Sequence, residues 1–271
     1  MKTKSVFIIA NITKPDYLSA LERAKKVVEN AGIAARTFTD PTALFTEAEK
    51  GKPLCIIIIG GDGTVLSAVS SAVNNGLSVD TPILGVNLGK IGFFSETDVD
   101  GLEAAFSRFL AGEYRLEESA MLKATAGENE FVCLNDFMVA KKGFSSVAHF
   151  EVLIDGYSMG VIHSDGVIIS SSTGSTGYSI SAGGPVIGPN LDVILVTPIC
   201  PHSLTVRPVV VSFDSRVEVV MRSDCVLHSD GAQLADLPEG DRITVQKAHT
   251  RVKFIRVTDR NVFKLIREKL A

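Results

Sequence analysis

The stretch Leu54–Leu66 reads L-C-I-I-I-I-G-G-D-G-T-V-L. Its four consecutive isoleucines, Ile56–Ile59, predict a strand that is buried on both faces of a parallel sheet. The strand ends at the loop G-G-D-G-T, residues 60–64, where glycines permit a tight turn and a close approach of backbone N–H groups to a ligand. Apolar residues at helical spacing follow, so the loop joins a strand end to a helix start. In open α/β sheets this position binds phosphate-bearing ligands.

A carboxylate stands in the middle of this glycine loop. Asp62 would repel a phosphate unless a metal ion or a proton transfer gives it a role. The alternative is an aspartate that forms the turn and caps the helix that follows. The intact five-residue loop favours the first interpretation.

The residues on either side of the loop predict an α/β domain. Strands alternate with helices, which indicates βαβ units, right-handed crossovers and an open parallel sheet. A second glycine turn, N-L-G-K-I-G-F at residues 87–93, follows the fourth predicted strand. The predicted strands are 6–10, 34–38, 54–59 and 83–87, and the predicted helices are Pro15 to about Asn30, the segment after the glycine loop, and 102–110.

From about Met121 the pattern changes to short strands separated by turns. The dipeptides Asp155-Gly156 and Asp230-Gly231 are typical of hairpins. We therefore expect an α/β domain over residues 1–118 and a β-rich, sandwich-like domain over 119–254, with a tail from about 255 to 271 that packs back on the first domain. The predicted strands are 131–140, 149–154, 161–171, 193–197, 217–221, 243–247 and 252–257, and a short amphipathic helix is predicted over 261–270.

Composition argues against several function classes. The 271 residues carry a net charge of −4, and no basic run exceeds Lys141-Lys142, which argues against nucleic acid or a membrane surface as the main partner. The four cysteines include no C-x-x-C pair, so we expect neither a zinc site nor a disulfide framework, and a reducing, cytoplasmic location. The apolar run after Met1 is too short for a signal peptide or a membrane span.

Two polar clusters stand out in the second half. Asn135-Asp136 lies among apolar strand residues, and an unpaired buried group costs about 1–3 kcal/mol, so the pair needs partners. These partners are either the edge of a base and ribose hydroxyls, or an internal network that ties a loop. Residues 170–185, S-S-S-T-G-S-T-G-Y-S-I-S-A-G-G-P, offer hydroxyls, backbone donors and Tyr178 to a nucleotide, although an ordinary Ser/Thr-rich loop is the alternative.

Together these motifs resemble the NAD kinase family. The G-G-D-G-T loop, the N-L-G-x-x-G-F turn and the strand-borne Asn135-Asp136 match it. So do Asp165-Gly166 with the serine-rich signature that follows, T-P-I-C-P-H at 197–202, and the late Asp230-Gly231. The motifs occur in the family's order over nearly the whole chain. Two departures are Gly177, where the family usually has alanine, and His163, where it often has arginine.

The resemblance implies transfer of the γ-phosphoryl group of ATP to the 2′-hydroxyl of the adenosine ribose of NAD, which gives NADP, with Mg²⁺ or another divalent metal. It implies that Asp62 is the catalytic residue, which either deprotonates that hydroxyl or ligates the metal. It also implies a homodimer or homotetramer formed through the β-rich domain. The residues implied in substrate binding are Gly60, Gly61, Asp62, Gly63, Thr64, Asn135, Asp136, His163, Asp165, Thr173, Thr176, Gly177, Tyr178, Ser179 and Ser181.

Two other functions stay open. Lipid kinases that act on diacylglycerol or sphingoid bases share the G-G-D-G-T loop and a two-domain plan, but the strings at 171–185 and 197–208 argue against them. A non-catalytic regulator would keep an NAD-binding pocket without the transfer, and the intact Asp62 argues against that.

Overall fold

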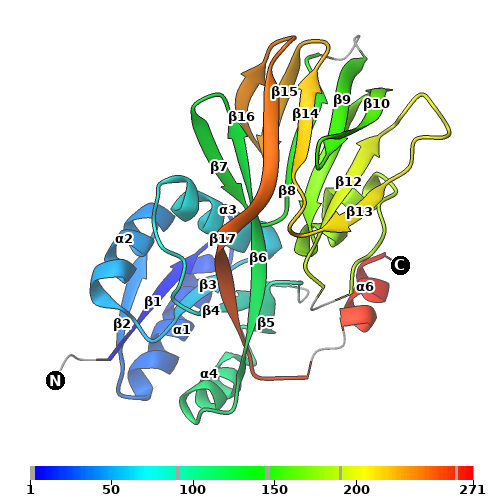
Figure 1. The fold of residues 1–271 in the computed structure, drawn as a ribbon. Coiled ribbons are helices and arrows are strands. Elements are labelled where there is room, and N and C mark those ends of the chain that lie inside the picture. Colours follow the sequence, from blue (N-terminus) through cyan, green and yellow to red (C-terminus); the bar gives the residue numbers. More distant parts are fainter. Residues whose placement is uncertain (1–3, 90–91, 144–146, 189–190, 260–261, 271) are drawn as a thin grey trace. The chain divides into compact units, whose positions relative to one another are not determined.

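The structure is a computed structural model that describes residues 4–89, 92–143, 147–188, 191–259 and 262–270. The chain divides into two compact units (Figure 1). The first comprises Met1–Ser119 and Arg251–Ala271, and the second comprises Ala120–Thr250. Two strands belong partly to each unit, β6 (Arg115–Ala126) and β17 (Arg242–Arg256).

The first unit is built on a parallel sheet. Its strands follow the order β4-β3-β1-β2, and β5 adds a further parallel partner to β4. The four isoleucines of β3 are completely buried, because parallel strands in such a sheet are covered on both faces. The strands are β1 (Ser5–Ala10), β2 (Ala34–Phe38), β3 (Ile56–Ile59), β4 (Ile83–Asn87) and β5 (Ser95–Asp98).

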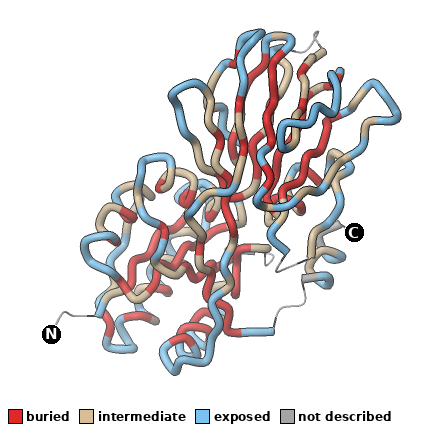
Figure 2. The backbone as a smooth tube through the Cα atoms, viewed as in Figure 1, coloured by how far each residue is buried: buried red, intermediate tan, exposed pale blue. Residues whose placement is uncertain are grey.

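Helices cover this sheet on both faces. Helices α1 (Tyr17–Asn30) and α4 (Leu102–Leu110) share one apolar core with alternate residues of β1, β3 and β4. Helices α2 (Pro41–Gly51) and α3 (Asp62–Asn74) pack against each other. Figure 2 shows the buried strands inside this unit and the exposed outer turns of its helices. The predicted α/β class is therefore confirmed.

The second unit is an antiparallel β-sandwich. One sheet has the strand order β13-β12-β11-β8-β15-β16, and the other layer contains β10, β9, β14, β17, β6 and β7. Apolar residues from both layers form a single buried core, as expected for two packed sheets. The strands that lie entirely in this unit are β7 (Asn129–Cys133), β8 (Asp136–Lys141), β9 (Ala148–Ile154), β10 (Tyr157–Ser164), β11 (Gly166–Ser171), β12 (Val193–Ile199), β13 (Val209–Ser212), β14 (Val217–Met221), β15 (Cys225–Ser229) and β16 (Ala232–Leu237).

Both predicted hairpin dipeptides connect antiparallel neighbours. Asp155-Gly156 joins β9 to β10, and Asp230-Gly231 joins β15 to β16. All four residues have positive φ, which is the conformation of a type I′ turn. Each hairpin also contains a register shift, between Ser158 and Val161 in the first and between Leu227 and His228 in the second.

Several element boundaries differ from the sequence interpretation. The strand predicted at 131–140 is interrupted between β7 and β8 by Leu134 and Asn135, and the strand predicted at 161–171 is interrupted at Asp165. The two predicted strands at 243–247 and 252–257 form one strand, β17. Helix α2 and strands β5, β6, β13, β15 and β16 were not predicted. Helix α6 (Val262–Leu270) lies where a C-terminal helix was expected.

Candidate active site

The glycine loop of the first unit lies between β3 and α3, as its sequence predicts. Gly60 donates its backbone N–H to the Val86 carbonyl at 2.8 Å. A Cβ at Gly60 would lie 2.3 Å from Thr64 Oγ1, so only glycine allows the Thr64 side chain to fold over the strand end. Thr64 Oγ1 in turn accepts a hydrogen bond from Asn11 Nδ2 at 3.0 Å. The first and last residues of the loop are thus held by packing within the unit.

The other two glycines of the loop are not required by internal packing. A Cβ at Gly61 or Gly63 would meet no atom within 4 Å. Gly61 is the N-cap of α3, a helix of 13 residues, whose first turn offers backbone N–H groups and a positive dipole end. Glycine at these positions fits close approach of an anionic ligand to the backbone.

The Asp62 carboxylate connects the glycine loop to the second glycine turn. Asp62 Oδ2 accepts the backbone N–H of Phe93 at 2.9 Å, and Oδ1 accepts that of Phe94 at 3.0 Å. A Cβ at Gly92 would lie 2.0 Å from Asp62 Oδ1, so glycine is needed for the turn to approach this closely. Gly61 rather than Asp62 is the N-cap, and the Asp62 side chain bonds to a different segment. Asp62 is therefore not the N-cap of α3.

The second glycine turn is also held at its base by a side chain. Asn87 Oδ1 accepts the N–H of Gly89 at 2.7 Å, and Asn87 Nδ2 donates to Ser95 Oγ at 3.2 Å. Lys90 and Ile91 of the predicted turn lie outside the described residues. The described part of the turn therefore presents ordered backbone N–H groups to Asp62.

In the second unit, Asn135 and Asp136 lie at the start of β8, and Asp230 holds their backbone. The Asp230 carboxylate accepts the N–H groups of Leu134 at 3.0 Å, Asn135 at 2.9 Å and Asp136 at 3.2 Å. Sequence reasoning identified Asp230 only as part of a hairpin turn and of a family motif. Its support of the Asn135–Asp136 connection was missed.

Burial next to Asp230 changes the chemistry of Asp136. The Asp136 residue is only 8% exposed. Desolvation, and then the charge of Asp230, raise the pKa of Asp136 from 3.8 to about 7. The same two causes, with a further contribution from Asp136, raise the pKa of the buried Cys133 thiol. Asp136 can therefore gain or lose a proton near neutral pH.

One buried side-chain acceptor in this region is not satisfied within the protein. Asn135 Oδ1 is buried and has no hydrogen-bond partner, which is costly unless a ligand supplies a donor. The internal network described for Asp230 involves the backbone, and it does not use this atom. The cluster is therefore suited to a ligand that carries an N–H or O–H group.

The serine-rich segment packs against the same cluster. It contains a 3₁₀ turn, η1 (Thr173–Thr176), and a short helix, α5 (Tyr178–Ser181). A Cβ at Gly174 would lie 2.2 Å from the Asn135 carbonyl oxygen, and one at Gly177 would lie 3.3 Å from Asn135 Nδ2. The structure thus brings the predicted residues of this segment and Asn135–Asp136 together.

The predicted binding residues of the segment differ in exposure. Tyr178 and Ser181 are exposed, whereas Thr173, Thr176 and Gly177 are half-buried. Thr176 Oγ1 donates to the Thr173 carbonyl at 3.2 Å. The Ser179 hydroxyl is buried and shares a hydrogen bond of 2.9 Å with Thr197, so in this structure Ser179 holds the segment to β12.

His163 and Asp165 lie at the junction of β10 and β11. The exposed His163 ring lies 4.3 Å from the ring of His149, measured between centroids. Asp165 accepts a hydrogen bond from Lys141 Nζ at 2.6 Å. His163 belongs to β10, which is in a different sheet from β8.

Among the residues that the structure describes, no group of three or more His, Cys, Asp or Glu side chains could hold a metal ion. None of the described helices is both long and apolar enough to cross a membrane.

The two units define a class of protein that combines a parallel α/β unit, with a glycine loop at a helix N-terminus, and an antiparallel sandwich with a buried polar cluster. Comparisons with known proteins identify the family. A family model described as the ATP-NAD kinase N-terminal domain matches residues 6–114, and one described as the ATP-NAD kinase C-terminal domain matches residues 134–257.

Relatives and solved structures agree with these matches. An NAD kinase of Lachnoclostridium phytofermentans is 34% identical over 98% of both chains. An NAD kinase of Moorella thermoacetica is 38% identical over 97% of this chain and 88% of its own. The chain therefore belongs to the NAD kinase family, a family of phosphotransferases, and the resemblance predicted from the sequence is confirmed. The lipid kinase alternative is not favoured.

Two solved structures share the fold at lower identity. The crystal structure of an NAD kinase from Archaeoglobus fulgidus in complex with ATP has a TM-score of 0.80 at 23% identity, over 97% of this chain and 98% of that one. Yeast NADH kinase complexed with NADH has a TM-score of 0.86 at 23% identity, over 99% of this chain and 88% of that one.

Proposed function

We propose that this protein transfers the γ-phosphoryl group of ATP to the 2′-hydroxyl of the adenosine ribose of NAD. The observation that carries the proposal is the Asp62 carboxylate, which two backbone N–H groups hold at the first turn of α3, inside the glycine loop. Phosphoryl transfer asks a protein mainly to position its substrates and to neutralise developing charge. A fixed carboxylate beside a phosphate-binding loop supports the orientation and deprotonation of the attacking hydroxyl.

The donor phosphates are assigned to the glycine loop. Gly61 and Gly63 leave the backbone accessible, and the first turn of α3 provides N–H donors and a positive dipole end. The Thr64 hydroxyl is already bonded to Asn11. We therefore assign Thr64 to holding the loop, and the backbone to contacting phosphate.

The described residues fit Mg²⁺ only in combination with phosphates. No protein cage of three ligands is found among them, but Mg²⁺ is commonly bound by one or two carboxylates together with substrate phosphates. Ligation of the metal by Asp62 is the alternative to its role as the base that deprotonates the hydroxyl. When bound, the metal would neutralise charge on the transferred phosphoryl group.

The acceptor nucleotide is assigned to the second unit. The unsatisfied Asn135 Oδ1 and the buried Asp136 carboxyl can bind an exocyclic amino group or ribose hydroxyls. Thr173, Thr176, Gly177, Tyr178 and Ser181 would line this site, and Ser179 would hold the segment in place. Asp165 and His163 are assigned to the nicotinamide half of NAD.

The assembly and the location are also part of the proposal. A homodimer or homotetramer formed through the sandwich is expected from the family resemblance. A cytoplasmic location is expected because the cysteines are free, with three of the four buried, as is usual where thiols stay reduced.

The experiment measures NADP formed by the purified protein from NAD, ATP and Mg²⁺, with diacylglycerol and sphingosine as parallel acceptors. We expect NADP, no product when magnesium is chelated, and a fall in kcat of at least about 100-fold in Asp62→Asn with NAD binding retained. Asp16→Asn is the matched control, because Asp16 is exposed and makes no capping bond to α1. Phosphorylated lipid without NADP would favour the lipid kinase, and NAD binding without any product would favour the regulator.

A further inference from the structure

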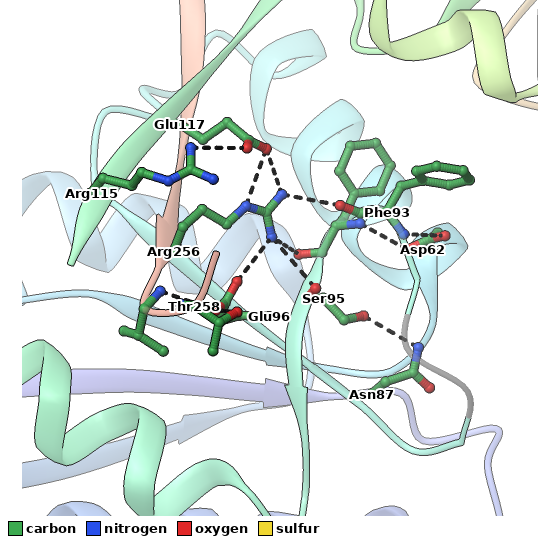
Figure 3. A network of polar contacts seen from close by, with 11 residues as sticks. Asp62, Asn87, Phe93, Ser95, Glu96, Arg115, Glu117, Arg256 and Thr258 are labelled. Carbon is green, nitrogen blue, oxygen red and sulfur yellow. Dashed lines mark hydrogen bonds and ion pairs between the residues drawn. The ribbon is translucent and has the colours of Figure 1, made fainter. Parts of the chain in front are cut away.

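A buried arginine near the end of β17 donates to the backbone of the second glycine turn. Arg256 is 3% exposed. Its Nη2 donates to the Phe93 carbonyl at 3.0 Å, and its Nη1 lies 3.5 Å from both the Phe94 and Ser95 carbonyls. Figure 3 shows the guanidinium facing these carbonyl groups. None of the sequence motifs includes this residue.

One of these peptide groups bonds to Asp62 on its other side. The carbonyl of Phe93 and the N–H of Phe94 belong to one peptide group, which accepts from Arg256 and donates to Asp62 Oδ1 (Figure 3). A hydrogen bond at a carbonyl polarises the N–H of the same peptide, and chains of such bonds strengthen one another. A cation at one end and a carboxylate at the other align the peptide between them.

Two carboxylates fix the arginine in this position. Glu117 Oε1 accepts from Arg256 Nε at 3.1 Å and from Nη2 at 2.7 Å. Glu96 Oε2 lies 3.7 Å from Nη1, and Glu96 Oε1 accepts the N–H groups of Val257 and Thr258 at 3.0 and 2.8 Å. The guanidinium therefore has little freedom to move away from the turn.

Attachment of the turn to β17 does not by itself require a charge. The rings of Phe94 and Phe254 already pack together, with centroids 5.3 Å apart. A buried ionic cluster is often no more stabilising than apolar residues of similar volume. What an apolar residue cannot supply is a fork of donors that fixes the orientation of successive carbonyls.

We propose that Arg256 is a positioning residue for Asp62, which it orients through the peptide group between Phe93 and Phe94. The inference rests on the proposed function of Asp62. The guanidinium sets the direction of the peptide group that carries the Phe94 N–H, and this N–H, with that of Phe93, sets the plane of the Asp62 carboxylate. A displaced carboxylate slows the transfer without changing how either nucleotide binds, since misplacement of about 1 Å can cost about 100-fold in rate.

The kinetic test compares Arg256→Gln and Glu117→Gln with the control Arg115→Gln. Arg115 is an exposed residue whose guanidinium lies 3.6 Å from Glu117. We expect kcat per NAD-binding site, counted by titration calorimetry, to fall about 10- to 100-fold in Arg256→Gln and about threefold in Glu117→Gln, with both KM values within about twofold of wild type. Arg115→Gln should match wild type. If Arg256 only stabilised the fold, fewer sites would bind NAD and each would keep the wild-type kcat, which would overturn the proposal.

Amide hydrogen exchange tests the coupling without using activity. In Arg256→Gln we expect the N–H of Phe94 to exchange at least about 10-fold faster, as it should in Asp62→Ala, while Arg115→Gln stays unchanged. Unchanged exchange in Arg256→Gln would refute the inference. If the wild-type protein forms no NADP, the proposed function fails, and the exchange rates still decide whether Arg256 orients the groups that hold Asp62. Glu117→Gln serves both measurements if Arg256→Gln does not fold.

Discussion

The raised pKa of Asp136 predicts that stability falls as pH rises toward neutrality. Its pKa is about 7 in the folded protein, against 3.8 for an unburied aspartate, because of desolvation and then the charge of Asp230. Between these values the folded protein binds more protons than the unfolded chain, so each rise in pH favours unfolding. The destabilisation is absent below about pH 4 and complete above about pH 7. Replacing Asp136 by the neutral Asn should remove it.

The difference between the two pKa values sets the magnitude. A rise from 3.8 to about 7 corresponds to about 4 kcal/mol, at about 1.4 kcal/mol for each tenfold change in proton affinity. Asp136 is almost fully buried, so solvent screening does not reduce this figure, but coupling to Asp230 does. We expect Asp136→Asn to raise the free energy of unfolding by about 2–4 kcal/mol at about pH 8 and by less than about 1 kcal/mol at about pH 4.

Urea unfolding at several pH values, followed by a signal from the sandwich, measures the effect. Asp214→Asn is the matched control, because Asp214 is an exposed aspartate of the same unit, paired with Lys247. Its stability difference from wild type should change by less than about 1 kcal/mol over this pH range. A difference between Asp136→Asn and wild type that is the same at both ends of the range would refute the reasoning.

Three other substitutions test contacts inside one unit or the other. Gly92→Ala places a Cβ 2.0 Å from Asp62 Oδ1, so NADP formation should fall at least about 10-fold, and an unchanged rate would show that the turn can retreat freely. Asp40→Ala removes the acceptor of the Ala43 N–H bond at 2.7 Å, and should cost about 1 kcal/mol in denaturant unfolding. Leu227→Ala opens a cavity in the sandwich core, and calorimetry should record a loss of about 2–5 kcal/mol.

Elements with a strong local pattern could be predicted from the sequence. Strands at 34–38 and 83–87 and the helix at 102–110 have the bounds of β2, β4 and α4. No residue of β2 is buried, but β4 is an apolar run buried along its whole length and α4 is an amphipathic run that buries one face. In such segments local propensity and tertiary burial favour the same structure.

Elements that depend on distant partners were missed. Helix α2 buries only Leu44, Phe45 and Ala48, so its apolar face is short, although Asp40 and Pro41 gave a usable start signal. Strand β6 begins with largely exposed residues, and its place is set by pairing with β7 and β17. The interruption at Asn135 follows from the bond to Asp230, 95 residues away in sequence.

The motif residues of the candidate site could be predicted from the sequence, but the residues that hold them in place could not. Asp62 and Asn135 stood out because a polar group among apolar or glycine residues is unusual. Arg256 gave no such signal, since a single arginine in a strand is common on protein surfaces. Its partner Phe93 is 163 residues away in sequence. Only the folded structure shows that the residue is buried and faces the turn.

In each of the two units a carboxylate accepts backbone N–H groups from a turn or a connection. In the first unit Asp62 accepts from Phe93 and Phe94, and in the second unit Asp230 accepts from the connection before β8. The consequences differ, because Asp62 is proposed as the reacting group, whereas Asp230 supports its neighbours. Desolvation, and then the negative charge of Asp230 that fixes the Asn135–Asp136 backbone, raise the pKa of Asp136. The contact that fixes this backbone therefore also places the charge of the Asp136 carboxyl under the control of pH near neutrality. We expect the affinity for NAD to depend on pH in that range.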